Sequence, residues 1–136
     1  MRPVVESLRF RVGKNLTPAP DDVTLEEALK LAETTDRRPG ALLLVSRETG
    51  RLTGVFTDAD LRRVVLKNPG GEALKRPVAG FMTRNPGTIA DTALLRDAVK
   101  MVREFRRDEI PVVDAQGRPI GLLDVQDLIA MKLVKE

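Results

Sequence analysis

The sequence predicts an α/β fold of two similar units that pack sheet against sheet around a pseudo-twofold axis. The first observation is an internal repeat, because residues 25–30 match residues 95–100 and residues 50–61 match residues 117–128. The second is periodicity, since helical spacing of apolar residues alternates with short continuous apolar runs in each copy. The third is size, because a unit of about 60 residues is marginal alone and gains a core by pairing.

The first copy is expected to run helix, strand, strand, helix. Its opening helix is indicated by apolar residues at helical spacing after Thr24, which is suited to an N-cap because Glu27 follows three residues later. The continuous apolar runs that follow are typical of strands buried on both faces. The expected elements are a helix over residues 25–32, strands over 42–45 and 54–56, and a final helix that carries Leu61, Val64 and Val65.

The second copy repeats this order, and Asp91 or Thr92 is placed to cap its first helix. Polar insertions over 35–40 and 46–49 account for the longer spacing in the first copy, since such turns tolerate changes of length. The expected elements are a helix with Leu95, Ala98, Val99 and Val102, strands over 110–113 and 121–123, and a final helix with Val125, Leu128, Ile129 and Leu133. A Gly- and Pro-containing loop over 67–72 separates the copies, which gives a first domain over 1–70 and a second over 71–136.

Composition excludes several classes of protein. The 136 residues include no Cys and no His, so disulfides, thiolate or histidine metal sites and Ser-His-Asp triads are ruled out. Trp and Tyr are absent and the net charge is only +3 without a dense basic block, which argues against nucleic-acid binding. Apolar runs are too short to span a membrane, and no apolar signal stretch follows the first residues, so we expect a cytoplasmic protein. Because no nucleophile–base pair can be assembled without His or Cys, we expect that it is not an enzyme.

The motifs shared by the two copies resemble those of tandem CBS domains, also called a Bateman module. A Gly-apolar-apolar-Thr/Asp-x-x-Asp-Leu pattern occurs twice, at 54–61 and 121–128, and Ile-Pro-Val-Val precedes it in the second copy. Met-Thr-Arg-Asn-Pro, over 82–86, precedes the second copy's first helix. The resemblance covers about residues 10–133 and is strongest to the CBS region of bacterial arabinose 5-phosphate isomerases. It implies βαββα units with small three-stranded sheets, and a sugar-isomerase or other effector domain that this sequence lacks.

Thr57 and Asp60 are the first candidate ligand-binding residues, because they lie where a strand passes into a helix. An ionised carboxylate can accept hydrogen bonds from both hydroxyls of a ribose, and a threonine hydroxyl can donate to a ribose or phosphate oxygen. The family resemblance implies this role for the Thr-x-x-Asp pattern. The alternative is a capping box, in which Thr57 caps the helix and Asp60 occupies its third position.

The equivalent pair in the second copy is Asp124 and Asp127. Asp127 keeps the ribose carboxylate, whereas Asp124 replaces the hydroxyl by a negative charge that would repel a phosphate by about 1 kcal/mol or more at 4 Å. We therefore expect unequal sites. The first copy is better suited to phosphorylated ligands, and the second is either empty or occupied by a ligand whose phosphates point elsewhere.

The resemblance also implies apolar walls for a purine base, and for each segment the alternative is a plain core strand. In the second copy the wall would consist of Ile110, Pro111 and Val112, completed by Thr88 and Ile89. In the first copy it would consist of Leu42 and Leu44, with Leu43 in place of the proline. Candidate cations for a phosphate are Arg84, which lies closest to the base wall, and Arg62, Arg63 and Arg107; the alternative is an exposed surface position.

Together these observations predict a regulatory module that binds an adenine nucleotide (AMP, ADP or ATP) in the cleft between the copies and thereby modulates an attached or partner protein. No catalytic residue, metal or cofactor is expected. The resemblance implies a homodimer, and neither a membrane nor a nucleic acid is expected as a partner. The alternatives are a ligand-free dimerisation or interaction module, and a CBS pair that binds S-adenosylmethionine, NAD or a CMP-sugar.

Overall fold

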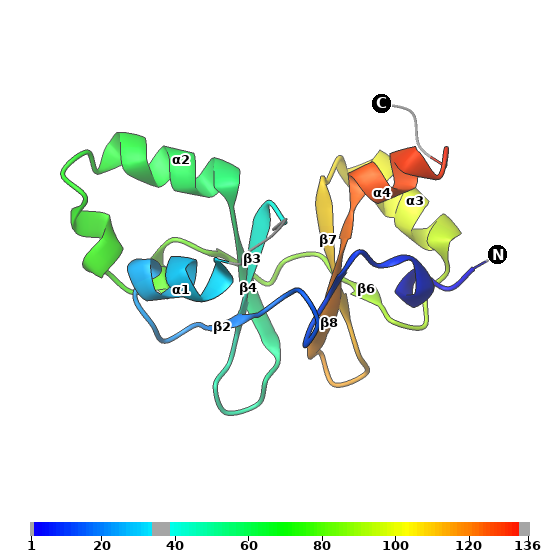
Figure 1. Cartoon of the computed structure of the whole chain (residues 1–136), viewed down its shortest axis with the longest axis horizontal. Helices are drawn as coiled ribbons and strands as arrows, with labels where there is room; N and C mark the ends of the chain where they lie inside the picture. Colours follow the sequence, from blue (N-terminus) through cyan, green and yellow to red (C-terminus); the bar gives the residue numbers. More distant parts are fainter. Residues whose placement is uncertain (1, 34–38, 134–136) are drawn as a thin grey trace.

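The computed structural model describes residues 2–33 and 39–133, and all statements below concern these residues. Two four-stranded sheets face each other in the middle of the molecule, and helices cover the outer side of each sheet (Figure 1). Of the predicted insertion over 35–40, the structure describes only residues 39 and 40. The second insertion, over 46–49, lies in the turn that joins two adjacent strands of the first sheet.

The first sheet has the strand order β2-β3-β4-β5. Strands β2 and β3 are parallel, and the other neighbours are antiparallel. Helices α1 and α2 cover this sheet (Figure 1). The elements are β2 (Ala19–Pro20), α1 (Leu25–Ala32), β3 (Ala41–Val45), β4 (Leu52–Thr57), α2 (Asp58–Lys67) and β5 (Thr83–Arg84).

The second sheet has the order β1-β8-β7-β6 and repeats the same pattern, with β6 and β7 parallel. Helices α3 and α4 cover its outer face (Figure 1). The elements are β1 (Phe10–Arg11), β6 (Ile89–Ala90), α3 (Leu95–Phe105), β7 (Glu109–Val113), β8 (Pro119–Asp124) and α4 (Val125–Ala130), and short 3-10 helices occur at Val4–Ser7, Glu72–Lys75 and Val78–Gly80.

The order of elements confirms the expected βαββα units, from β2 to α2 and from β6 to α4. The expectation of three strands per sheet is wrong, because each sheet gains an edge strand of two residues from outside its unit. Strand β1 precedes the first unit yet pairs with β8, and β5 follows it yet pairs with β4. The domain boundary between residues 70 and 71 stays a prediction. Each edge strand pairs with a strand on the other side of that boundary.

Three apolar clusters form the core, one between each sheet and its helices and one between the sheets. Strand β3 shows how the sequence builds them. Leu42 and Leu44 face the helices, whereas Ala41 and Leu43 face the other sheet, because successive side chains of a strand point to opposite faces. This arrangement confirms the prediction of strands buried on both faces.

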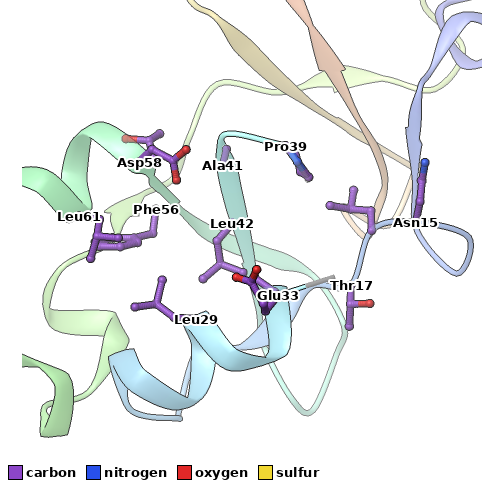
Figure 2. A pocket seen from close by; sticks show the side chains of 13 residues that line it. Asn15, Thr17, Leu29, Glu33, Pro39, Ala41, Leu42, Phe56, Asp58 and Leu61 are labelled. Carbon is purple, nitrogen blue, oxygen red and sulfur yellow. The ribbon is translucent and has the colours of Figure 1, made fainter. Parts of the chain in front are cut away.

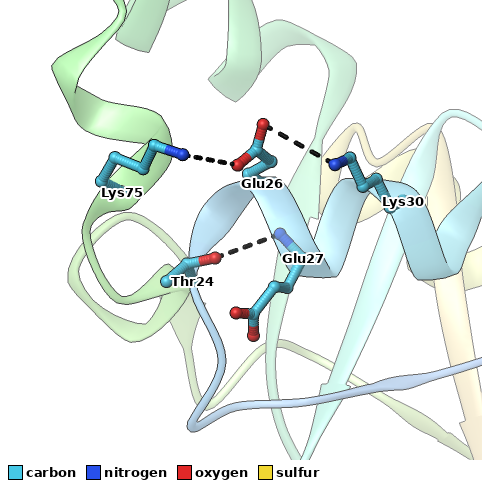
Figure 3. Close-up of polar contacts among 5 residues, drawn as sticks. All are labelled: Thr24, Glu26, Glu27, Lys30 and Lys75. Carbon is cyan, nitrogen blue, oxygen red and sulfur yellow. Dashed lines mark hydrogen bonds and ion pairs between the residues drawn. The ribbon is translucent and has the colours of Figure 1, made fainter.

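Side-chain caps fix the helix starts. The Thr24 hydroxyl accepts the Glu27 N–H at 3.1 Å, as predicted (Figure 3). Lys75 donates to Glu26 at 3.2 Å and lies on the segment that leads to β5, so this contact ties that segment to α1. The Lys75 hydrogen bond lowers the pKa of Glu26. Helix α3 begins differently from the prediction, because its N-cap is Leu94, whose N–H donates to the Asp97 carboxylate at 2.8 Å, and not Asp91 or Thr92.

The two β-hairpins hold the sheets together at one end of the molecule. The Leu52 N–H donates to the Gly117 carbonyl at 2.9 Å, and Arg118 Nε donates to the Thr49 carbonyl at 3.0 Å. At the opposite end lie the start of β3, the end of β4 and their counterparts in the second sheet (Figure 1). Candidate site residues gather at that second end. None of the helices in the described part of the chain is both long and apolar enough to cross a membrane.

Candidate ligand-binding site

Thr57 and Asp60 form a reciprocal capping box at the junction of β4 and α2. The Asp60 N–H donates to the Thr57 hydroxyl at 3.1 Å, and the Thr57 N–H donates to Asp60 Oδ2 at 3.0 Å. Arg63 donates to Asp60 Oδ1 at 2.8 Å. The capping alternative raised by the sequence is therefore present. It leaves ligand capacity, because the Thr57 hydroxyl keeps its proton to donate and a carboxylate has about four acceptor positions.

A cavity of about 200 Å³ lies between α1 and the end of the first sheet, and we call it the first-repeat cavity (Figure 2). Helix α1 contributes Leu29 to its lining, and α2 contributes Asp58 and Leu61. Its wall is mostly apolar, with Thr57 and Asp58 at one side. The other apolar lining residues are Leu16, Ala32, Pro39, Ala41, Leu42 and Phe56, and the other polar ones are Asn15, Thr17 and Glu33.

A second cavity, of about 390 Å³, lies between the two repeats, and we call it the central cavity. Ala41, Thr57 and Asp58 line both cavities, so the two spaces adjoin. The first repeat also contributes Gly40, Val55 and Ala59, and the remaining lining residues are Pro86, Arg107, Asp108, Glu109, Pro111 and Leu122. A ligand seated in the first-repeat cavity could therefore extend into the space between the sheets.

Acidic groups converge on the central cavity. Burial, together with the nearby carboxylates of Asp124, Asp108 and Asp58 in that order of importance, raises the pKa of Glu109 to about 7. Asp124 lies directly opposite Glu109 in the β7–β8 ladder, whereas Asp58 belongs to the first repeat. A Cβ atom built on Gly40 would lie 3.3 Å from Glu109 Oε1, so the Glu109 side chain reaches the first repeat.

In the second repeat, both predicted site carboxylates already interact with other groups of the protein. The Asp124 carboxylate caps α4 by accepting the Gln126 N–H at 2.8 Å. Asp127 is only 6% exposed and forms an ion pair with Arg9 at 2.7 Å. No pattern in the sequence could pair Arg9 with Asp127, because the two residues lie near opposite ends of the chain and meet only when β1 joins the second sheet.

Some residues of the predicted base walls line a cavity, and others lie in the core. Leu42 lines the first-repeat cavity, and Pro111 lines the central cavity. Ile110 and Val112 are 1% and 0% exposed and pack in the core beneath α3 and α4. Ile89 lies in the same core, Leu44 is fully buried beneath α1 and α2, and Thr88 is exposed.

The predicted cations also take different positions. Arg107 lines the central cavity, and its guanidinium lies against Gly87. Arg84 is exposed on β5 and donates to the Ala79 carbonyl at 3.3 Å. Arg62 and Arg63 are exposed on α2. Arg107 is thus the candidate that the structure brings to a cavity shared by both repeats.

Several lining residues were missed by sequence reasoning, among them Asn15, Thr17, Glu33 and Phe56. Glu109 could have been flagged, because it immediately precedes the Ile-Pro-Val-Val strand and aligns with Ala41 of the first copy. Among the residues that the structure describes, no group of three or more Asp and Glu could hold a metal ion. The chemistry available here is therefore an apolar pocket with hydroxyl, carboxylate and guanidinium groups at its edge.

Comparison with known proteins places these features in a family. The family model described as CBS domain matches residues 5–67 and 78–133. Over 93 residues, the chain is 33% identical to the arabinose 5-phosphate isomerase KdsD of Pseudomonas aeruginosa; this covers 68% of the chain and only 28% of that relative. The chain therefore spans less than a third of the isomerase's length.

Two solved structures share the fold over nearly the whole chain. A CBS domain protein from Pyrobaculum aerophilum, complexed with AMP, superposes with a TM-score of 0.78 at 23% identity, covering 98% of both chains. The CBS domain of a bacterial CNNM/CorC family Mg²⁺ transporter, in complex with ATP, superposes with a TM-score of 0.73 at 26% identity, covering 98% of this chain and 88% of the other.

Proposed function

The chain belongs to the CBS domain family as a tandem CBS pair, a regulatory module, and from that premise we propose that it binds an adenine nucleotide and so modulates an attached or partner protein. The observation that carries this proposal is the first-repeat cavity, which combines an apolar pocket with the Thr57 hydroxyl and opens to the space between the repeats. The AMP and ATP bound by the two structural neighbours support the choice of ligand class.

The apolar part of the first-repeat cavity suits the adenine ring. Leu29, Leu42, Phe56 and Leu61 surround it from α1, the sheet and α2 (Figure 2). Ligand pockets in proteins are mostly apolar, with a few polar groups that fix orientation. We therefore place the base among these side chains and the ribose towards Thr57.

The ribose would meet the capping box. The Thr57 hydroxyl, which already accepts the Asp60 N–H, would donate its proton to a ribose oxygen. Asp60 is not among the residues that line either cavity, so its carboxylate would receive a ribose hydroxyl only if the ribose sits close above the first turn of α2. Its remaining acceptor positions allow this without loss of the Thr57 N–H.

The phosphate would extend into the central cavity. There the Arg107 guanidinium offers a forked set of N–H donors that matches phosphate oxygens. A ligand in this position touches both repeats, and it changes their arrangement only through its different affinity for the alternative arrangements. Such a change would be the signal passed to an effector, for which a sugar-isomerase domain is one candidate.

We propose that only the first repeat binds in this way. In the second repeat, Asp127 is buried against Arg9, and Asp124 and Glu109 place carboxyl groups where the first repeat has Thr57 and Ala41. Breaking a buried ion pair costs several kcal/mol because it leaves a charge without compensation. Asp127 also lines neither cavity and is buried, so a ribose could reach its carboxylate only by disturbing this contact.

Isothermal titration calorimetry of the whole chain with AMP, ADP and ATP tests the proposal. We expect Asp60→Asn to weaken binding about tenfold, the loss of one charge-assisted hydrogen bond. Asp97→Asn is the matched control, because Asp97 holds the same position in α3 and accepts its N-cap N–H at 2.8 Å, but its N-cap residue Leu94 lines neither cavity, whereas Thr57 lines both. No binding of any adenine nucleotide at millimolar concentration would refute the proposal, and S-adenosylmethionine, NAD or a CMP-sugar would then be titrated.

A second candidate function is a dimerisation or interaction module without a ligand. Apolar side chains exposed on the helices favour it, since Leu66 and Val65 on α2 are 76% and 56% exposed and Phe105 on α3 is 61% exposed. Large exposed apolar patches often mark protein interaction sites. We propose that α2 contributes to a homodimer, which is compatible with nucleotide binding on the sheet side of the same helix.

A further inference from the structure

We propose that an anionic ligand entering the central cavity binds together with a proton on Glu109, so that its affinity rises as the pH falls through neutrality. This inference rests on the proposed function and concerns the regulation of the same site. It follows from where the Glu109 carboxylate lies, which charges face it, and what an added phosphate would do to them.

Glu109 is placed at the contact between the repeats. It is the first residue of β7, and its Oε1 atom lies close to the backbone of Gly40 in the first repeat. Both residues line the central cavity. A ligand that enters the central cavity therefore comes close to this carboxylate.

The charges that face Glu109 come from both repeats. Asp124 faces it from β8, Asp108 precedes it in the chain, and Asp58 reaches it from the start of α2. Arg107 is the one cation among the described residues that line the central cavity, whereas Asp58, Asp108 and Glu109 are three carboxylates of the same lining. Among these described lining residues, negative charges therefore outnumber positive ones when every carboxyl group is ionised.

This environment already favours the protonated carboxyl group. Burial and the three neighbouring carboxylates raise the pKa of Glu109 to about 7, so a large fraction of the molecules carries this proton near neutral pH. A phosphate in the cavity adds a further negative charge close by, and like charges raise a carboxyl pKa. Because linkage is reciprocal, a ligand that raises this pKa binds more tightly to the protonated protein.

The first repeat has no carboxyl group at the position equivalent to Glu109. In the pairing of β3 with β4, Ala41 lies opposite Thr57, while in the second repeat Glu109 lies opposite Asp124. Glu109→Ala therefore installs the first repeat's residue at the equivalent place. Glu109→Gln keeps the side chain's shape and removes only its ability to exchange a proton.

The experiment is calorimetric titration of AMP at pH 7.5 in Tris and in HEPES, two buffers with different ionisation enthalpies. The dependence of the observed heat on buffer gives the number of protons taken up on binding. For a pKa that rises from about 7 to about 8, wild type takes up roughly half a proton at Glu109. The AMP phosphate itself titrates near pH 6, and this contribution is common to all variants and cancels in the comparison.

We expect Glu109→Gln and Glu109→Ala to lose this uptake and to bind AMP more tightly than wild type at pH 8.5, by roughly three- to tenfold. At pH 6 the three proteins should bind AMP with similar affinity. Glu48→Gln is the matched control, because Glu48 is an exposed carboxylate in the β3–β4 turn and lines neither cavity. It should behave as wild type.

Two other outcomes are distinguishable. If AMP binds and the Glu109 variants take up as many protons as wild type, the inference is overturned and the proposed nucleotide function stands. If AMP binds to none of the proteins at any of the three pH values, the proposed function fails and the inference falls with it.

Discussion

Replacing Glu109 by glutamine is predicted to stabilise the folded chain above neutral pH and to change it little at pH 5. In the folded protein the pKa of Glu109 is raised from 4.5 to about 7, mainly by burial. The folded state therefore holds this proton more tightly than the unfolded chain. The stability that the proton contributes is fully present below pH 4.5 and is lost as the pH rises through 7.

The size of the effect follows from the pKa difference. One pKa unit corresponds to about 1.4 kcal/mol, so the full difference would amount to about 3.5 kcal/mol. Glu109 is only partly buried, and water screens its interactions, which reduces the expected loss to about 1–2 kcal/mol. With an unfolding entropy of about 2.1 cal/mol/K per residue, Glu109→Gln should raise the Tm at pH 8 by about 4–7 °C.

Urea denaturation followed by circular dichroism at pH 5 and pH 8 measures this difference. Wild type and Glu109→Gln should have similar unfolding free energies at pH 5 and separate at pH 8. Glu48→Gln, which changes an exposed carboxylate, should follow wild type at both values. A Glu109→Gln effect of equal size at both pH values would refute the reasoning, because it would not arise from the titration of this carboxyl group.

Three further predictions concern packing and assembly. Arg9→Met should destabilise the chain by about 2–3 kcal/mol in thermal denaturation, because Asp127 keeps a buried charge without its guanidinium partner; a loss below about 0.5 kcal/mol would contradict this. Gly121→Ala should cost about 1–3 kcal/mol, since the new Cβ would lie 2.6 Å from the Phe10 carbonyl oxygen, and an unchanged urea midpoint would show that β1 adjusts freely. Leu66→Glu should convert the proposed homodimer to monomers in sedimentation velocity, whereas a wild type that sediments as a monomer would exclude the dimer.

The internal repeat made most of the fold predictable. Residues 25–32, 42–45 and 54–56 carried local patterns that do not depend on distant partners, and all three elements formed as expected. The edge strands β1 and β5 could not be predicted, because two residues are too few to show a period. Their pairing is decided by the sheets that they join.

The candidate site was predictable where it depends on a local motif. Thr57 and its capping box follow from four consecutive residues, and Leu42 follows from the adjacent strand. The burial of Asp127 by Arg9 was not predictable, since it depends on the N-terminal strand crossing to the second sheet. The cluster of carboxyl groups at the central cavity could not be predicted either, because only the packing of the two repeats brings Asp58 close to Glu109.

A crystal structure of the chain grown with AMP tests the central claim most directly. We predict density for adenine in the first-repeat cavity against Leu42 and Phe56, a ribose at Thr57, and the phosphate in the central cavity near Arg107. The Arg9–Asp127 ion pair should remain intact. A nucleotide bound in the second repeat, with its ribose on Asp127 and the first-repeat cavity vacant, would contradict the account.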